Sequence, residues 1–174
     1  MSTKRHRGVI VLSLLIVHIF SVSILYADDL SEGAKIFVET EFNTLDSFEM
    51  LPEAVVKYLM DKIDEPISPI GGPFRATDVV ITPPDIPSRR LMYLGEANDV
   101  FIIWYEHGGR GYHHHVVLLR IKDAEEASDD EDQVTPIFLA RPLFNAEDMV
   151  ELKQRISDGT IQDEKEQILE HGYW

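Results

Sequence analysis

The chain contains no cysteine. This absence excludes disulfide bonds, a lipid-modified cysteine and a cysteine nucleophile, so a packed core alone must stabilise the fold. Sequence motifs of common enzyme classes are missing as well, since there is no G-x-S-x-G elbow, no phosphate-binding P-loop and no H-E-x-x-H pair. The sequence therefore leaves enzyme activity uncertain and favours a non-catalytic protein.

Basic residues are scarce. Only 16 lysines and arginines stand against 31 aspartates and glutamates, which gives a formal net charge of −15. Because nucleic-acid binding needs positive charge to displace the counterions on phosphate, this balance excludes DNA and RNA as partners. It favours solubility, and it would attract a basic protein or a divalent cation. Seven acids and no base fall within residues 123–132, which we expect to form a solvated acidic loop.

The longest apolar stretch lies near the amino terminus. It covers residues 9–20 and follows a cluster of basic residues, and a shorter, more polar stretch leads from it to Ala27, a small residue suited to cleavage. This order is typical of an export signal, so we interpret residues 1–27 as a signal peptide and expect a periplasmic or extracellular protein. Cleavage would remove three basic residues and no acid, which takes the net charge from −15 to −18. The alternative is an uncleaved membrane anchor over residues 9–26, near the minimum length of a membrane span.

Residues 28–174 predict a single α+β domain, because their number is ordinary for one domain. Apolar residues at Val55, Leu59 and Ile63 recur at helical spacing. This pattern predicts an amphipathic helix over 51–63. Residues 36–42 alternate only in part and fit either a strand or a short helix.

Several segments have the composition of β-strands and are separated by turn residues. Short links favour antiparallel neighbours, so the predicted sheet is an antiparallel β-meander of about four or five strands. Two helices are expected after it, one from a cap at Asn145 and one over 161–171. One N-terminal and two C-terminal helices would then flank the meander. The predicted strands cover residues 78–82, 90–95, 100–106, 112–121 and 134–140.

Histidine is concentrated at one predicted hairpin. Four of the chain's seven histidines lie within residues 107–115, around the glycine-rich link 108–111. A four-residue loop there would place Glu106 opposite His113, with His115 on the same face of the sheet. Alternate residues of a strand lie about 6.5–7 Å apart on one face, close enough for two imidazoles to bind one metal ion.

Glu106, His113 and His115 are therefore the candidate metal ligands. Two histidines and one carboxylate suit Zn²⁺ or another divalent metal with an open coordination position. The opposite face would hold His107 and His114, a poorer set. A one-residue slip of register would move Glu106 to that face. The alternative interpretation treats these histidines as hydrogen-bonded residues at the rim of the sheet, or as a pH-sensitive binding surface.

Three functions remain open on this sequence. The first is a non-catalytic exported module that binds a basic protein or another component of the cell envelope. The second is a divalent-metal-binding protein built on the hairpin. The third is a structural domain held at the membrane by an uncleaved N-terminal helix. No residue is assigned a catalytic role, and the oligomeric state is left open.

Overall fold

The computed structural model describes six segments of the chain: residues 30–63, 65–77, 85–109, 111–122, 133–142 and 146–172. The predicted signal peptide, the predicted strand over 78–82 and the acidic loop over 123–132 lie outside these segments. Asn145, the expected cap of a helix, lies outside them too. No helix within the described segments is both long enough and apolar enough to cross a membrane.

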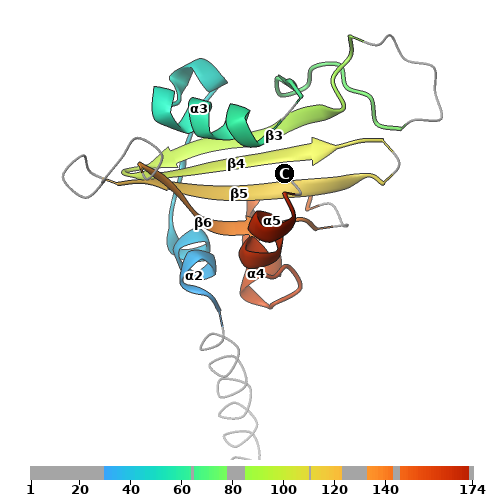
Figure 1. Ribbon diagram of the computed structural model, residues 1–174. Helices are drawn as coiled ribbons and strands as arrows, with labels where there is room; N and C mark the ends of the chain where they lie inside the picture. Colours follow the sequence, from blue (N-terminus) through green and yellow to red (C-terminus); the bar gives the residue numbers. More distant parts are fainter. Residues whose placement is uncertain are drawn as a thin grey trace, which may run out of the picture.

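Four antiparallel strands form the body of the fold (Figure 1). β3 (Arg89–Ala97), β4 (Val100–His107), β5 (His113–Ile121) and β6 (Val134–Ala140) are neighbours in sequence order. This arrangement confirms the predicted α+β class and meander, and β6 has the bounds expected from the sequence. The tight turn between β3 and β4 contains Asn98, whose φ of 55° is a conformation that asparagine tolerates.

Two very short strands complete the sheet along β3. β1 (Asn43–Thr44) pairs antiparallel with the end of β3, and β2 (Ile67–Ser68) pairs parallel with its beginning. A 3₁₀ turn, η1 (Phe48–Met50), follows β1 along the chain. A two-residue strand is too short to carry the alternation by which a sequence reveals a strand, so neither was predicted.

Two helices precede the long strands. α3 (Glu53–Lys62) confirms the helix predicted over 51–63. α2 (Glu32–Glu39) resolves the ambiguous segment 36–42, since the chain is helical as far as Glu39 and extended beyond it. The Ser31 side chain caps α2 by accepting a hydrogen bond from a backbone N–H of its first turn at 3.1 Å.

The two C-terminal helices are shorter than expected. α4 spans Met149–Ser157 and α5 spans Lys165–His171, so the helix predicted over 161–171 is wrong in its first four residues. The last two of these residues contact the outer edge of β6: the Asp163 carboxylate accepts from the Leu139 N–H at 3.2 Å, and the Glu164 N–H donates to the Leu139 carbonyl at 2.7 Å. Pairing with a strand edge therefore replaces the first turn of the expected helix.

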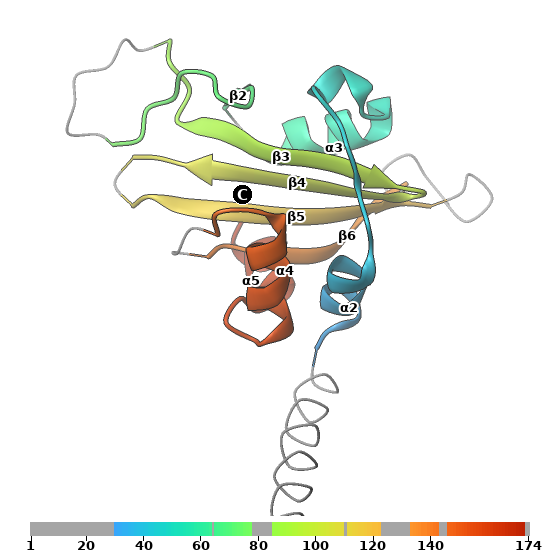
Figure 2. The same cartoon turned by 180° about the vertical axis from the view of Figure 1, so that it is seen from behind.

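Helices cover both faces of the sheet (Figures 1 and 2). α3 packs Val55 and Leu59 into one core, which also takes in Ile168 of α5. α2 and α4 pack Phe37 and Leu152 into the core on the other face. β4 and β5 contribute to both cores and are buried along most of their length. They are the central pair that their apolar faces predict.

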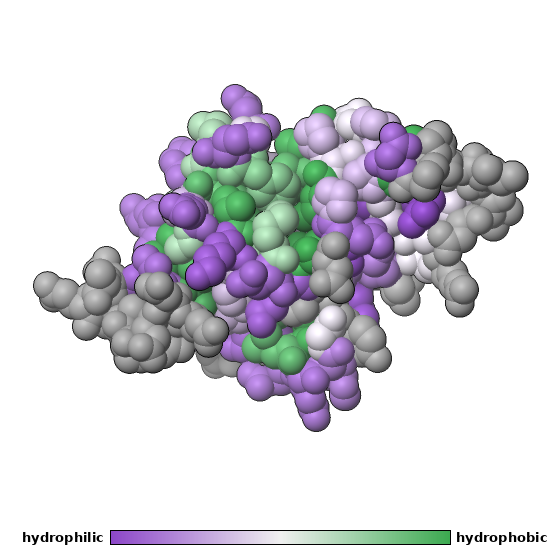
Figure 3. Space-filling view, turned by 45° about the horizontal axis from the view of Figure 1, so that its top comes forward, coloured by the Kyte–Doolittle hydropathy of each residue, from purple (hydrophilic) through white to green (hydrophobic). Residues whose placement is uncertain are grey.

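An apolar patch lies beside α3 (Figure 3). Figure 3 shows apolar atoms gathered on this face of the molecule. Ala54, Tyr58 and Ile121 are partly buried and pack against the core. A groove of about 810 Å³ passes these side chains and reaches Val134 at the start of β6. The groove therefore lies between α3 and the end of the sheet opposite the histidine hairpin, and charged side chains of α3 line it together with apolar ones.

Candidate metal centre

The hairpin of β4 and β5 closes one residue later than predicted. Its link spans five residues, 108–112, so His107 pairs with His113 and Glu106 pairs with His114. The predicted pairing of Glu106 with His113 is therefore wrong by one residue. Because side chains of a strand alternate between faces, Glu106 lies on the face opposite to His113 and His115.

Tyr112 belongs to the link and not to β5. Its hydroxyl donates a hydrogen bond to Glu106 Oε2 at 2.6 Å and lies 3.1 Å from His114 Nε2. The side chain thus folds back over the end of the hairpin and binds groups of both strands. Counting Tyr112 as the first residue of β5 produced the error of register.

Gly108 fixes the other end of the link. Its N–H donates to the Ser88 carbonyl at 2.8 Å, and a Cβ at this position would lie 1.9 Å from the Arg75 carbonyl oxygen. The next residue, Gly109, has a φ of 101°, which L side chains rarely adopt. The link is therefore a turn, as its glycines predict, with a path that also depends on contacts to distant parts of the chain.

The observed register brings three histidines together on one face. His107, His113 and His115 each offer one ring nitrogen, and these three atoms lie within 4.8 Å of one another. Their ring centroids are 4.8 to 5.8 Å apart. Nitrogens bound to one tetrahedral Zn²⁺ would be about 3.4 Å apart, given Zn–N bonds near 2.05 Å. Small side-chain rotations therefore suffice to close the site, with His107 in the place predicted for Glu106.

Neighbouring groups orient the three rings. His113 Nδ1 lies 2.5 Å from the Gly111 carbonyl oxygen, so a proton on Nδ1 leaves the lone pair on Nε2. The His115 ring stacks on Tyr105, with centroids 4.7 Å apart and planes 4° from parallel. His115 is 3% exposed, yet its Nε2 has no hydrogen-bond partner among the described residues. The Nδ1 atom of His107 is also buried and also has no hydrogen-bond partner among them. Buried polar atoms in this state are uncommon in folded proteins.

The electrostatic environment keeps two of these histidines neutral. Burial, with the nearby charges of Arg89 and His113, lowers the pKa of His107 to about 4. Burial also holds the pKa of His115 well below its usual value, with smaller effects from His113 and His107. Neutral imidazole is the form that binds a metal ion, so both rings are ready for coordination at neutral pH.

A cation and a carboxylate lie beside the cluster. Arg89 on β3 lies directly opposite His107 on the neighbouring strand β4, and its exposed fraction is 8%. Its positive charge opposes a bound metal ion, but Glu65 lies close to it, with Oε2 3.6 Å from Arg89 Nη1. The Ser88 hydroxyl also donates to the Glu65 carboxylate. Because Glu65 offsets the charge of Arg89, the field at the three histidines is less positive than that of an isolated arginine.

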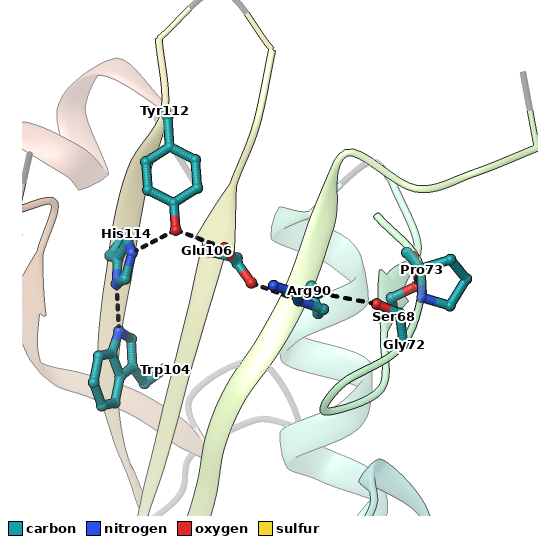
Figure 4. Close-up of polar contacts among 8 residues, drawn as sticks. All are labelled: Ser68, Gly72, Pro73, Arg90, Trp104, Glu106, Tyr112 and His114. Carbon is teal, nitrogen blue, oxygen red and sulfur yellow. Dashed lines mark hydrogen bonds and ion pairs between the residues drawn. The ribbon is translucent and has the colours of Figure 1, made fainter. Parts of the chain in front are cut away.

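The opposite face of the hairpin carries a closed hydrogen-bond network (Figure 4). Trp104 Nε1 donates to His114 Nδ1 at 2.9 Å, so the proton of His114 lies on Nε2, which can donate to the Tyr112 hydroxyl. Tyr112 donates in turn to Glu106, whose other oxygen accepts from Arg90 Nε at 2.5 Å. Both carboxylate oxygens of Glu106 are therefore occupied, and the residue is 2% exposed. Glu106 is a structural acceptor in this arrangement.

The predicted ligand set is thus brought together in part. His113 and His115 lie side by side as alternation requires, Glu106 is separated from them by the sheet, and His107 is the residue that the prediction set aside. The sequence could have pointed to His107, because shifting the predicted pairing of the two strands by one residue places His107 and His113 on the same face of the sheet. The roles of Tyr112 and Arg90 carried no sequence signal, since they depend on contacts across three strands.

The end of this hairpin therefore presents three converging imidazoles on one face and a saturated network of polar side chains on the other. Comparisons of the chain with protein families, with curated proteins and with solved structures found no match.

Proposed function

We propose that this protein is an exported, non-catalytic domain of the cell envelope that binds one divalent transition-metal ion through His107, His113 and His115. One observation carries the proposal. Three ring nitrogens lie within 4.8 Å of one another, and buried nitrogens of His107 and His115 have no hydrogen-bond partner among the described residues. A metal ion would give these buried atoms the partner that the protein does not supply.

The ligand chemistry favours Zn²⁺. Imidazole nitrogen binds zinc, copper and nickel well, whereas Ca²⁺ and Mg²⁺ prefer oxygen ligands, and all three groups in this cluster are imidazoles. Zinc accepts three histidines in a tetrahedral arrangement and leaves the fourth position to another ligand. The hydrogen bond from His113 Nδ1 to the Gly111 carbonyl is the kind of second contact that orients a zinc-bound histidine.

The overall charge supports the same function. After removal of residues 1–27 the chain would carry 13 basic and 31 acidic residues, because three of its 16 basic residues lie in that segment. Such a charge raises the concentration of cations near the protein surface and speeds their encounter with the site. The proposed location outside the cytoplasm is tested separately, by reading the N-terminus of the purified protein, which should show cleavage after Ala27. An intact Met1 in membrane fractions would contradict it.

The metal site is tested by titrating the purified protein with Zn²⁺ and with Co²⁺, whose visible absorption reports tetrahedral coordination. The wild type should bind one equivalent. His113→Ala and His107→Ala should each weaken binding about 100-fold, because each removes a ligand from a site that has three. Both residues are only half-buried, so these substitutions leave the core intact. His171→Ala is the matched control, since His171 lies on α5 outside the cluster.

Glu106→Gln separates the observed ligand set from the one that the sequence predicts. It preserves the shape of the side chain, and Glu106 lies on the opposite face of the sheet from the cluster, so the affinity for Co²⁺ should stay within about threefold of wild type. A loss comparable to that of His113→Ala would show that the carboxylate is a ligand. Absence of any saturable binding by the wild type would refute the metal proposal itself.

A second candidate function is a module that binds a basic protein or another envelope component without metal. The observation that favours it is the groove of about 810 Å³ beside α3, where apolar side chains such as Ile121 and Val134 lie next to the carboxylates Glu53 and Asp61. Crosslinking to envelope extract, compared between the wild type and Tyr58→Asp, tests this function. A crosslinked partner that Tyr58→Asp loses and His113→Ala retains would favour partner binding over metal binding.

A further inference from the structure

We infer that the Tyr105 hydroxyl donates a hydrogen bond to a small ligand at the fourth coordination position of this metal site, either a water molecule or a compact anion. The inference rests on the proposed metal function and names the class of its fourth ligand. It also adds a positioning residue to the three histidines, because Tyr105 would hold the ligand without binding the metal ion itself.

Tyr105 lies on the same face of the sheet as the histidine cluster and contacts it directly. It stands opposite His115 in the pairing of β4 with β5, and two residues before His107 on β4. Because paired residues and alternate residues of a strand share a face, the three side chains project to the same side. The Tyr105 ring stacks on the His115 ring, with centroids 4.7 Å apart and planes 4° from parallel. This stack holds the phenol against one of the proposed metal ligands.

The Tyr105 hydroxyl is buried without an acceptor for its proton. The residue is 0% exposed, and its hydroxyl oxygen has no hydrogen-bond partner of good geometry among the described residues. The Arg89 side chain interacts with this oxygen, but a guanidinium carries donors only and cannot accept the proton. A tyrosine hydroxyl keeps its proton at neutral pH, and a buried donor without an acceptor is uncommon because it costs stability. The hydroxyl therefore lacks an acceptor that an external ligand can supply.

The same ligand would complete the metal site. Three protein ligands leave a tetrahedral Zn²⁺ ion with one open position, which water or an external ligand fills. A ligand atom lies about 2 Å from the ion, and a hydroxyl donates its hydrogen bond over about 2.7 Å. A donor can thus reach the fourth ligand from about 5 Å away from the ion, without approaching the coordinating nitrogens. One small ligand would satisfy both the metal ion and the hydroxyl proton.

The two contacts define the chemistry of the ligand. It must bind the metal ion with one lone pair and accept the hydrogen bond with another. The oxygen of water and the terminal nitrogen of azide each have both lone pairs, whereas an ammonia nitrogen has no second one. Burial limits the size of the ligand, since Tyr105 and His115 are 0% and 3% exposed. Water and compact anions meet both conditions.

The test compares Tyr105→Phe with wild type as purified, Co²⁺-loaded protein, with sodium azide as the probe. Azide is titrated while the visible absorption of bound Co²⁺ is followed. The wild type should respond saturably, and Tyr105→Phe should bind azide about tenfold more weakly because one hydrogen bond is lost, while its Co²⁺ affinity stays within about threefold of wild type. Tyr93→Phe is the matched control and should leave azide binding unchanged, since the Tyr93 hydroxyl contacts Thr44 and Phe42.

A second measurement needs no variant. Binding of Zn²⁺ to the metal-free wild type should shift the near-ultraviolet absorption of a tyrosine to longer wavelength, because the Tyr105 hydroxyl gains an acceptor when the fourth ligand arrives. Zinc binding without such a shift would overturn the inference, even if Tyr105→Phe failed to fold.

The outcomes separate this inference from the proposed function. Failure of the wild type to bind Co²⁺ would defeat the metal site and the role of Tyr105 together. Normal Co²⁺ binding with no response to azide, or with equal azide affinities of wild type and Tyr105→Phe, would overturn only the role of Tyr105. A parallel loss of Co²⁺ affinity and azide affinity in Tyr105→Phe would also overturn it, because the hydroxyl would then support the histidines and not the fourth ligand.

Discussion

Replacing Tyr112 by phenylalanine tests the register of the hairpin directly. The substitution removes one hydroxyl, which donates to a carboxylate oxygen of Glu106 at 2.6 Å and lies 3.1 Å from His114 Nε2. A hydrogen bond to a charged group contributes about 1.5–3 kcal/mol to stability. Tyr112 is 36% exposed, so water replaces part of the lost contact, and we expect a cost of about 1.5 kcal/mol.

The assay is equilibrium unfolding in urea and by heat. For a domain of this size, 1.5 kcal/mol lowers the midpoint temperature by about 3–6 °C. The urea midpoint should fall while the slope m stays constant, because the folded structure is otherwise unchanged. Tyr93→Phe is the matched control, since its hydroxyl makes only neutral contacts of 3.3 Å, and its cost should be about 0.5 kcal/mol.

A cost for Tyr112→Phe no larger than that of Tyr93→Phe would refute the reasoning. It would mean that the Tyr112 hydroxyl does not bind Glu106, and the five-residue link would lose its main support. The placement of His107 beside His113 would then need another explanation, because the same register sets both contacts.

Three further predictions concern the same end of the sheet. Gly108→Ala should destabilise the protein by about 3 kcal/mol or more in urea unfolding, because the new Cβ would meet the Arg75 carbonyl oxygen, whereas Gly111→Ala, with open space at its Cβ, should be neutral; equal costs would contradict the path of the link. Zinc at 100 times its dissociation constant should stabilise the wild type by about 2.7 kcal/mol, seen as a rise of about 5–10 °C in the melting temperature; because His113→Ala should bind about 100-fold more weakly, the same zinc concentration should stabilise that variant by only about 0.4 kcal/mol, a rise of about 1 °C. The metal-free protein should lose stability as the pH falls from 6.5 towards 4, because the pKa of His107 is lowered from 6.5 to about 4 and the unfolded chain therefore takes up the proton first. At pH 5 the contribution of His107 amounts to about 1 kcal/mol after allowance for its solvent-exposed part, so His107→Gln should reduce the difference between unfolding at pH 7 and pH 5 by about that amount. A part of the difference should remain, because burial also holds the pKa of His115 well below its usual value.

The long elements could be predicted because each has a pattern that burial enforces. Val55 and Leu59 recur at helical spacing and are fully buried, so the helix over 51–63 was visible in the sequence. β3 to β6 are separated by short links or by one acidic segment, which left an antiparallel meander as the natural arrangement. Local patterns of this kind are independent of where distant residues lie.

The register of β4 against β5 could not be predicted in the same way. A strand with one buried face fixes its register through its apolar alternation, but these two strands are buried on both faces. Shifting one strand by one residue exchanges its two apolar faces, so the apolar side chains are buried equally well in either register. The choice depends on Tyr112 and Gly108, whose contacts reach Glu106, Ser88 and Arg75. The short α5 has a similar cause, since the outer edge of β6 binds residues that would otherwise begin a helix.

The two faces of the hairpin end differ in a way that bears on function. On one face, Glu106 and His114 have partners for every side-chain polar atom, and an arginine and a tyrosine complete their network. On the other face, buried nitrogens of His107 and His115 have no partner among the described residues. Both faces belong to the same two strands, so poor packing of the hairpin as a whole cannot explain why only one face has polar atoms without partners. A face that is rigidly supported from behind and chemically incomplete in front is suited to hold an external ion, because binding would complete its contacts without reorganising the sheet.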